Sequence, residues 1–314
     1  MTYSAVVSGY TFATNHAVAR SDLSNLLVSA TRNTGTFRYS VTAGAYAFPV
    51  VGQPLVPTFQ STGLYGVVPV AYVQYAPSAT FTMSAGKLAT LLGYESGFTF
   101  QNVNVQRGLA WNAEPDISRG VRAAYTKANL TVELELNDGY YSGNRRAVEG
   151  LVGYAASPAT GVQFAFIVPD ANTPGNATSS VANKAEYNLM LTQGFGKLQL
   201  TPYLLFVASP ASTNAGFAAA ESASAQVVIA NYAFDPAFSL AARFEHMANN
   251  SGTGDTSANA DLVGYGPGSS ASTWTITPAY RYKQFTFRGE YSNVSAGGAG
   301  FSQSRIGLEI LGQF

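Results

Sequence analysis

Acidic and basic side chains recur at every second position in short segments of this sequence. In the segment Leu130–Leu136, for example, Glu133 and Glu135 alternate with valine and leucine. A strand turns alternate side chains to opposite faces, so the charges share one face and the apolar residues share the other. Ionised groups in that pattern suit no covalent chemistry, but facing water they would attract, orient or exclude ions. The residues assigned to the charged faces are Arg38, Arg122, Glu133, Glu135, Arg243, Glu245, Arg281, Arg288, Glu290, Arg305 and Glu309.

Nucleophilic and metal chemistry have few candidate residues. The chain has no cysteine and only two histidines, His16 and His246. A hydrolase on a barrel would need a serine beside a histidine and a third polar group to orient the imidazole. The sequence places no serine obviously beside His246, so we predict that the protein is not an enzyme. The oxygen-rich segment 249–255 and Asp261 do not match an established calcium loop. We therefore predict no cofactor and no metal, although calcium at these residues stays open.

Composition limits the class of protein. Charged residues make up 11% of the 314 residues, against about 25% in soluble domains, and a lipid-facing surface would explain the deficit. The net charge is zero and basic runs are absent, which argues against nucleic acid as a partner. No stretch reaches ~18 consecutive apolar residues, so no transmembrane helix is predicted. Met1 does not begin an export signal, so we expect that a signal peptide was removed or that Met1 was added for expression.

The charged faces need strands to position them. We predict about sixteen strands, joined alternately by tight turns and by longer connections at 49–66, 88–118, 170–184 and 248–271. The second strand is predicted to start at Ser24, and a tight turn at Lys127-Ala128 would set Arg122 directly opposite Glu133. No segment could supply a core for so many apolar faces, whereas lipid outside and water inside would satisfy both faces. The predicted fold is all-β. One domain, residues 1–314, forms a transmembrane antiparallel up-and-down β-barrel in the bacterial outer membrane, with short periplasmic turns and long extracellular loops.

The longest connection, 88–118, is too long for a simple linker. It contains Glu95, Arg107, Glu114 and Asp116 among aromatic residues. We expect it to fold into the lumen as a constriction, with its acids facing Arg243 and Arg281 on the far wall. Opposed charges across a narrow gap would create a transverse field that favours polar solutes. Removal of Glu114 and Asp116 should then change ion selectivity; the alternative is that these charges only form a lattice of ion pairs.

The same part of the chain contains its most distinctive motifs. They are Gly86–Glu95, Phe100–Asn102, Arg107–Asn112, Glu114-Pro115, Ser118–Val121 and Leu136–Gly143. Over roughly residues 80–143 the sequence resembles the OmpL-like outer-membrane porins, the beta-barrel porin-2 family. The resemblance implies a monomeric or oligomeric pore in a Gram-negative outer membrane, and it brings no catalytic or ligand-binding residues with it.

The leading functional prediction is a porin that allows passive diffusion of small hydrophilic solutes and ions. The alternative is a structural or interaction barrel that anchors extracellular loops for adhesion or array formation, which apolar loops such as Ala211–Ser224 would suit. The expected partners are the lipid bilayer, lipopolysaccharide and small hydrophilic solutes. A homotrimer is an expectation by analogy with other sixteen-stranded pores.

Overall fold

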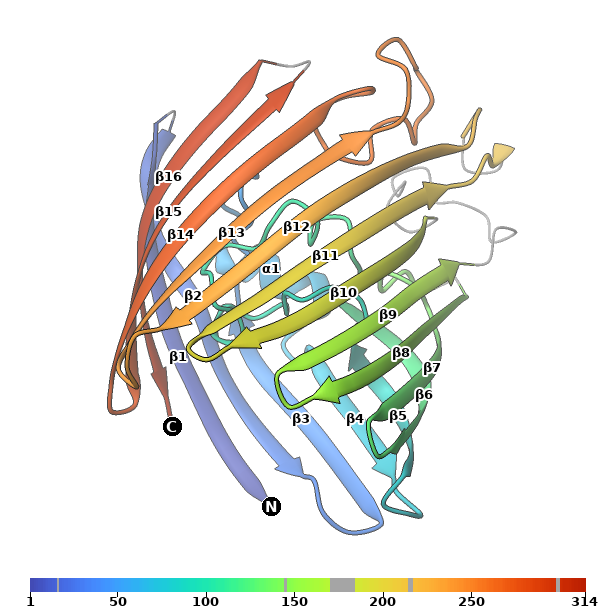
Figure 1. The fold of residues 1–314 in the computed structure, drawn as a ribbon, viewed down its shortest axis with the longest axis vertical. Helices are drawn as coiled ribbons and strands as arrows, with labels where there is room; N and C mark the ends of the chain where they lie inside the picture. The colour runs from blue at the N-terminus through green and yellow to red at the C-terminus, as the bar shows by residue number, and fades with distance from the viewer. Residues whose placement is uncertain (16, 144–145, 170–183, 214–216, 298–299) are drawn as a thin grey trace.

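The computed structural model describes residues 1–15, 17–143, 146–169, 184–213, 217–297 and 300–314. In this part of the chain, sixteen antiparallel strands form a closed barrel (Figure 1), which confirms the predicted fold class. The strands are β1 (Thr2–Thr14), β2 (Ala17–Arg32), β3 (Phe37–Tyr46), β4 (Val70–Tyr75), β5 (Phe81–Ala89), β6 (Ile117–Lys127), β7 (Leu130–Asn137), β8 (Ala147–Ser157), β9 (Thr160–Pro169), β10 (Ala185–Phe195), β11 (Leu198–Ser209), β12 (Glu221–Ala233), β13 (Phe238–Asn249), β14 (Ser270–Tyr282), β15 (Phe285–Gly297) and β16 (Phe301–Gln313).

The barrel closes where β1 pairs with β16, over a register that runs from Val6 opposite Gln313 to Thr14 opposite Arg305. Closure gives every strand two neighbours, so that the backbone groups along the paired registers are satisfied within the wall. Both termini lie at one end, with the short turns (Figure 1). We call this the turn end. The other end, with the long connections, is the loop end.

The second strand begins earlier than the sequence pattern indicated. We expected it to start at Ser24, but β2 starts at Ala17. The register with β1 shifts between Ser8 and Gly9, and both Ser24 and Asn25 are fully buried. A bulge of this kind puts two successive side chains on one face and hides the period of two.

Prolines within strands interrupt the pairing on one side only. Pro202 pairs with Val228 on β12, but its register with β10 is broken at that point. Pro278 likewise pairs with Leu240 on β13, while its register with β15 is broken. A proline lacks the backbone donor that the missing ladder bonds would need.

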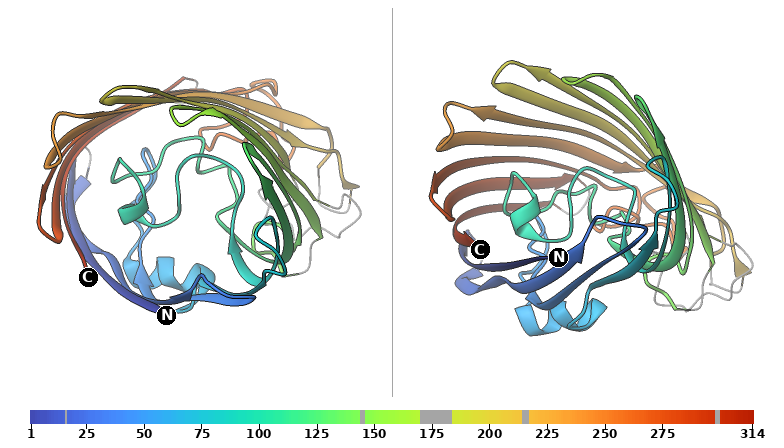
Figure 2. Two further views of the ribbon diagram at one scale, coloured as in Figure 1. Left: turned by 60° about the horizontal axis from the view of Figure 1, so that its bottom comes forward. Right: turned by 90° about the horizontal axis from the view of Figure 1, so that it is seen from below.

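The β3–β4 connection carries the helix α1 (Thr58–Tyr65). The helix lies against β2 and β3 at the edge of the barrel (Figure 2). The Thr58 hydroxyl donates a hydrogen bond to the carbonyl of Leu23 on β2. The next residue, Phe59, points away from these strands and is 74% exposed. Among the described residues, no helix has the length and apolar character needed to span a membrane.

Candidate functional site

The barrel wall separates an apolar outer face from a polar inner face. On β7, Leu130, Val132, Leu134 and Leu136 are between 38% and 63% exposed on the outer surface, while the glutamates between them face inward. The inner face is not uniformly open. Glu135, Glu245, Glu290 and Glu309 are at most 3% exposed, and Arg243, Arg288 and Arg305 are at most 5% exposed. These are buried beneath chain segments that enter the barrel.

The main covering segment is the β5–β6 connection, residues 90–116, which we call the interior segment. It lies inside the ring of strands in both views of Figure 2 and contains the short 3-10 helix η1 (Thr99–Gln101). It is flanked by the start of the β3–β4 connection, since the backbone of Val50 pairs with that of Arg107. A loop in this position carries backbone groups that need partners away from bulk water.

Wall glutamates accept hydrogen bonds from backbone N–H groups and from hydroxyl groups of the interior segment. Glu245 accepts from Leu109 at 2.9 Å and from Ala110 at 3.1 Å. Glu290 accepts from the backbone of Val105 and of Gln106, the latter at 2.9 Å. Glu309 accepts from the Thr99 hydroxyl at 2.7 Å, and Glu149 from the Thr90 hydroxyl at 2.7 Å. We call these four residues, spread over β8, β13, β15 and β16, the anchoring glutamates.

Wall arginines bind the carbonyl groups of the same segments. Arg243 donates to the carbonyl of Gln106 at 2.7 Å, Arg288 to that of Asn102 at 2.7 Å, and Arg305 to that of Val50 at 3.0 Å. Arg288 also forms an ion pair with Glu309, and Arg243 one with Glu245. Charge-assisted hydrogen bonds are about twice as strong as neutral ones. The buried charges of the inner wall therefore hold the interior segment by its backbone.

The predicted constriction residues lie on the interior segment, in different surroundings. Glu95 is in contact with Arg243 in a buried ion pair and accepts from the backbone of Gly108 at 2.7 Å. Burial raises the pKa of Glu95, while Arg243 acts in the opposite direction. Arg107 is fully buried, with its guanidinium 5.6 Å from the ring centres of both Phe48 and Trp111. Burial lowers the pKa of Arg107 to about 10.

Glu114 and Asp116 are each 7% exposed. Neither oxygen of Glu114 has a hydrogen-bond partner among the described residues, and burial, with Glu186 nearby, raises its pKa well above the ordinary value. Burial also raises the pKa of Asp116, to about 6, although Arg107 opposes the rise. Of the four predicted constriction residues, Glu95 is the one that meets a predicted wall arginine directly, with no water-filled gap between them.

The remaining predicted inward charges are accessible to solvent, and all but Arg122, which lies at mid-height of β6, are close to the turn end. They are Arg38, Arg122, Glu133 and Arg281. Arg281 lines a cavity of about 330 Å³ between the interior segment and the wall, together with Asn102, Asn231 and Thr286. A second cavity of about 310 Å³ has Glu133, Gln163 and Thr192 on its inner wall. Polar space thus persists on the turn-end side of the interior segment.

One predicted cross-strand pair has a different register. We expected Arg122 to lie opposite Glu133, with a turn at Lys127-Ala128. Instead Lys127 pairs with Leu130, and Arg122 lies opposite Glu135, to which its Nε donates at 2.6 Å. Glu133 is the diagonal neighbour, with 3.7 Å between its Oε2 and the Arg122 Nη1. The turn occupies Ala128-Asn129, and Ala128 takes φ of +50°, which shifts the register by two residues.

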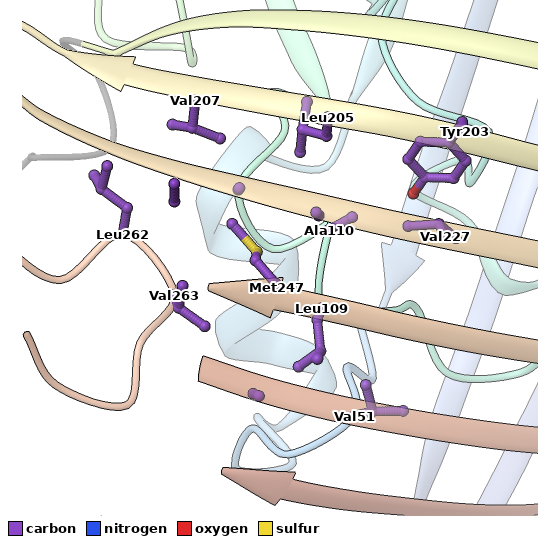
Figure 3. Close-up of a cluster of buried hydrophobic side chains, with 14 of the residues drawn as sticks. Val51, Leu109, Ala110, Tyr203, Leu205, Val207, Val227, Met247, Leu262 and Val263 are labelled. Carbon is purple, nitrogen blue, oxygen red and sulfur yellow. The ribbon is translucent and has the colours of Figure 1, made fainter. Parts of the chain in front are cut away.

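A buried apolar surface also supports the interior segment, and sequence reasoning missed it. Leu109 and Ala110 pack among Val51, Met247 and Val227, with Leu205 and Val207 alongside (Figure 3). The signal was present in β11, where Tyr203–Val207 is a continuous apolar run rather than an alternating one. Such runs indicate a strand that is apolar on both faces.

His246 has a partner that the sequence did not reveal. We expected no serine beside it, but His246 pairs with Ser272 on β14, and its Nδ1 lies 2.8 Å from the Ser272 hydroxyl. The two residues are distant in sequence and meet only through strand register. Among the described residues, no side chain hydrogen bonds to the other imidazole nitrogen, so the orienting group of a catalytic triad is lacking. His16 lies outside the described residues.

In the oxygen-rich connection near residue 255, the Asp261 carboxylate accepts its hydrogen bonds from neighbouring residues of the protein. Asp261 accepts from the backbone of Gly264 at 2.7 Å and of Gly266 at 2.8 Å, and from the Asn249 side chain. Within the described part of the chain, no three histidine or acidic side chains come together as metal ligands.

Comparisons with known proteins agree with this architecture. The family model described as "Putative beta-barrel porin-2, OmpL-like" matches residues 3–313. Among solved structures, the chain is similar to a loop L8 deletion mutant of OmpT, an outer membrane protein of Vibrio cholerae (TM-score 0.67, 10% identity, covering 100% of this chain and 98% of that chain). It is also similar to the outer membrane channel DcaP of Acinetobacter baumannii (TM-score 0.67, 12% identity, 100% and 96% covered). A trimer form of OmpT, folded in vitro, matches with a TM-score of 0.64 at 10% identity, covering 100% and 98%. No curated protein sequence matches the chain.

Proposed function

The chain belongs to the OmpL-like beta-barrel porin-2 family of outer-membrane proteins, and on that basis we propose that it is a pore for passive diffusion of small hydrophilic solutes and ions. Sixteen strands enclose enough space for an aqueous channel when nothing fills it. The interior segment would narrow that space, and solutes would pass the polar surface left beside it.

The observation that carries this proposal is the way in which the interior segment is held. Four anchoring glutamates and three arginines bind it by main-chain groups and by side chains, with Arg305 donating to the side-chain oxygen of Gln106. Contacts of this number are hard to break together, so we propose that the segment is a permanent constriction and does not open and close as a lid. The pore would then have a small and constant conductance.

The solvent-accessible inward charges suggest a weak preference for anions. Arg122 is paired with Glu135 and lies near Glu133. Arg281 has no ion pair among the described residues, and Arg38 donates only to the carbonyl of Gly35. Two unmatched positive charges near the turn end would attract anions and repel cations.

We further propose that the loop end faces the outside of the cell and the turn end faces the periplasm, as in barrels of this class. The expected surroundings are lipid and, at the outer leaflet, lipopolysaccharide. A homotrimer is also proposed, since OmpT has a trimer form. We propose no catalytic role for the chain.

Burial of the inner charges beneath the interior segment favours one alternative. If the interior segment and the β3–β4 connection together close the lumen, the barrel would be a plugged anchor that presents its outer loops for adhesion or array formation. A plugged anchor would carry no current.

Planar-bilayer recording of the purified protein separates these functions. A pore should give discrete single-channel steps and, in a salt gradient, a reversal potential displaced modestly towards that of the anion. Absence of channels from protein that is shown to be folded would refute the pore and favour the anchor. A strong preference for cations would refute the proposed role of Arg38 and Arg281.

A further inference from the structure

Basic residues on the outer face of the barrel gather in one sector of the loop end. Lys87 and Arg119 pair across β5 and β6 in the same register as the outward Val121. Arg146, which immediately precedes β8, is exposed beside them. The other outward basic residues within the described part of the chain lie at the turn end. A charged side chain facing hydrocarbon at mid-depth is costly, but the cost falls near the membrane interface, where these residues lie.

An apolar groove lies directly below this basic cluster. Leu136, Val148 and Val168 occupy one row across β7, β8 and β9, since Leu136 pairs with Val148 and Val148 with Val168. All three are on the outer surface, with exposures of 63%, 37% and 39%. Together with Arg119 and Arg146 they line a groove of about 570 Å³. The groove thus has a basic rim and an apolar floor.

The turn that follows β7 positions the rim. Arg119 donates to Asp138 at 2.7 Å and stacks on Tyr141, with 4.1 Å between the guanidinium carbon and the ring centre. Tyr140 and Tyr141 have φ of +49° and +57°, a conformation that bulky side chains rarely adopt. It sends Tyr140 inward to Glu186 and leaves Tyr141 against Arg119. Strain of this kind persists only where the surroundings impose it.

We propose that this groove is a binding site for a phosphorylated lipid of the outer leaflet, of the lipid A type. Arg119 and Arg146 would contact a phosphate, and the row Leu136, Val148 and Val168 would contact an acyl chain. Arg119 is held ready by Asp138 and Tyr141, while Arg146 has no partner among the described residues. Guanidinium groups suit phosphate because they donate parallel hydrogen bonds. An amphiphile with an anionic head matches both halves of the groove, whereas a free anion would use only the rim. The site rests on the proposed orientation of the loop end, but it does not depend on whether the pore conducts.

Native mass spectrometry of the detergent-solubilised protein, titrated with diphosphoryl lipid A, tests the site. The test variant is Arg119→Gln with Arg146→Gln. The matched control is Lys127→Gln with Lys283→Gln, which removes the same charge at the turn end. We expect one saturable lipid A site in the wild type and in the control. Binding should weaken by about tenfold for each arginine lost, the effect of one charge-assisted hydrogen bond.

Two further variants and two comparison ligands also test the proposed site. Arg146→Gln alone should fold normally and still weaken binding. Asp138→Asn keeps an oxygen acceptor but adds one net positive charge to the rim, so it should bind lipid A more tightly; loss of binding would indicate a merely structural role for the cluster. Inorganic phosphate and dephosphorylated lipid A should each bind far more weakly than diphosphoryl lipid A. Equal binding by inorganic phosphate, or wild-type affinity in the double variant, would overturn the proposal.

Discussion

Two levels of the barrel interior use the same residue types for different purposes. Around mid-height, Arg243, Glu245 and Glu290 are buried and hold the interior segment. Near the turn end, Arg281 faces a cavity and has no ion pair among the described residues. Both sets obey the same alternation along their strands. A charge on the inner face of this barrel is therefore a structural contact where the interior segment covers it, and it is open to solvent where no segment does.

Among the variants proposed here, removal of Arg243 should cause the largest loss of stability. Arg243→Met would leave Glu95 and Glu245 as uncompensated buried charges, which costs about 3–5 kcal/mol. We expect a correspondingly lower free energy of unfolding, measured by guanidinium titration in vesicles. Release of the interior segment should also increase single-channel conductance. Arg281→Met on the adjacent strand is the control and should leave stability within about 0.5 kcal/mol of the wild type. Equal losses of stability in both variants would contradict the distinction between the covered level and the turn end.

The pH dependence of stability should identify Asp116 as part of the buried region. Its pKa is raised from 3.8 to about 6, so between these values the folded protein keeps a proton that the unfolded chain releases. The contribution of Asp116 to the free energy of unfolding should therefore be largest below pH 3.8, fall by about 3 kcal/mol as the pH rises to about 6, and stay constant above it. Asp116→Asn should match the wild type at pH 3.5 and exceed it at pH 7, in unfolding titrations at both values. A variant less stable than the wild type at pH 7 would show that the carboxylate is needed in its ionised form.

Replacement of one anchoring glutamate should have a smaller effect. Glu290→Gln keeps one acceptor oxygen but loses the charge that assists its bonds to Val105 and Gln106. We expect the free energy of unfolding of Glu290→Gln to fall by about 2 kcal/mol. Glu133→Gln, on the inner wall at the turn end, is the matched control. A larger loss of stability in the control would indicate that the solvent-accessible inner charges also stabilise the fold.

The smallest effect on stability, but the clearest on transport, is expected at the cavity. Arg281→Glu should change stability by no more than about 0.5 kcal/mol and should shift the reversal potential in a salt gradient towards that of the cation. Arg243 cannot serve as the comparison for selectivity, since it is buried. An unchanged reversal potential would place the solute path away from Arg281.

Sequence periodicity predicts the faces of strands well, because alternation is a local property. It identified the inner position of residues such as Arg243 and Glu309, the number of strands and the long connection before Ser118. It did not predict what lies against each face. A tight turn displaced by one position shifts a register by two residues, as between Arg122 and Glu135, and the pairing of His246 with Ser272 depends on such registers.

The pattern along a single strand also cannot predict which part of the inner wall another segment of the chain covers. In the sequence, Glu245, Glu290 and Glu309 occur in the same alternating pattern as Glu133. They differ from Glu133 in that the interior segment contacts them. The apolar run of β11 was the one local sign that part of the inner wall would be dry.

Thiol accessibility tests most directly whether the interior segment is seated on the wall. The chain has no cysteine, so single cysteines can be placed at Thr286 and Ser292, which lie on the same strand and the same inner face. Thr286 lines the turn-end cavity, whereas Ser292 is 2% exposed and accepts from the Gln106 side chain at 2.8 Å. With a small charged thiol reagent applied to the membrane-embedded protein, Thr286→Cys should react at least ~100-fold faster, because Ser292→Cys reacts only after local opening. Equal reaction rates would show that the segment does not cover the wall.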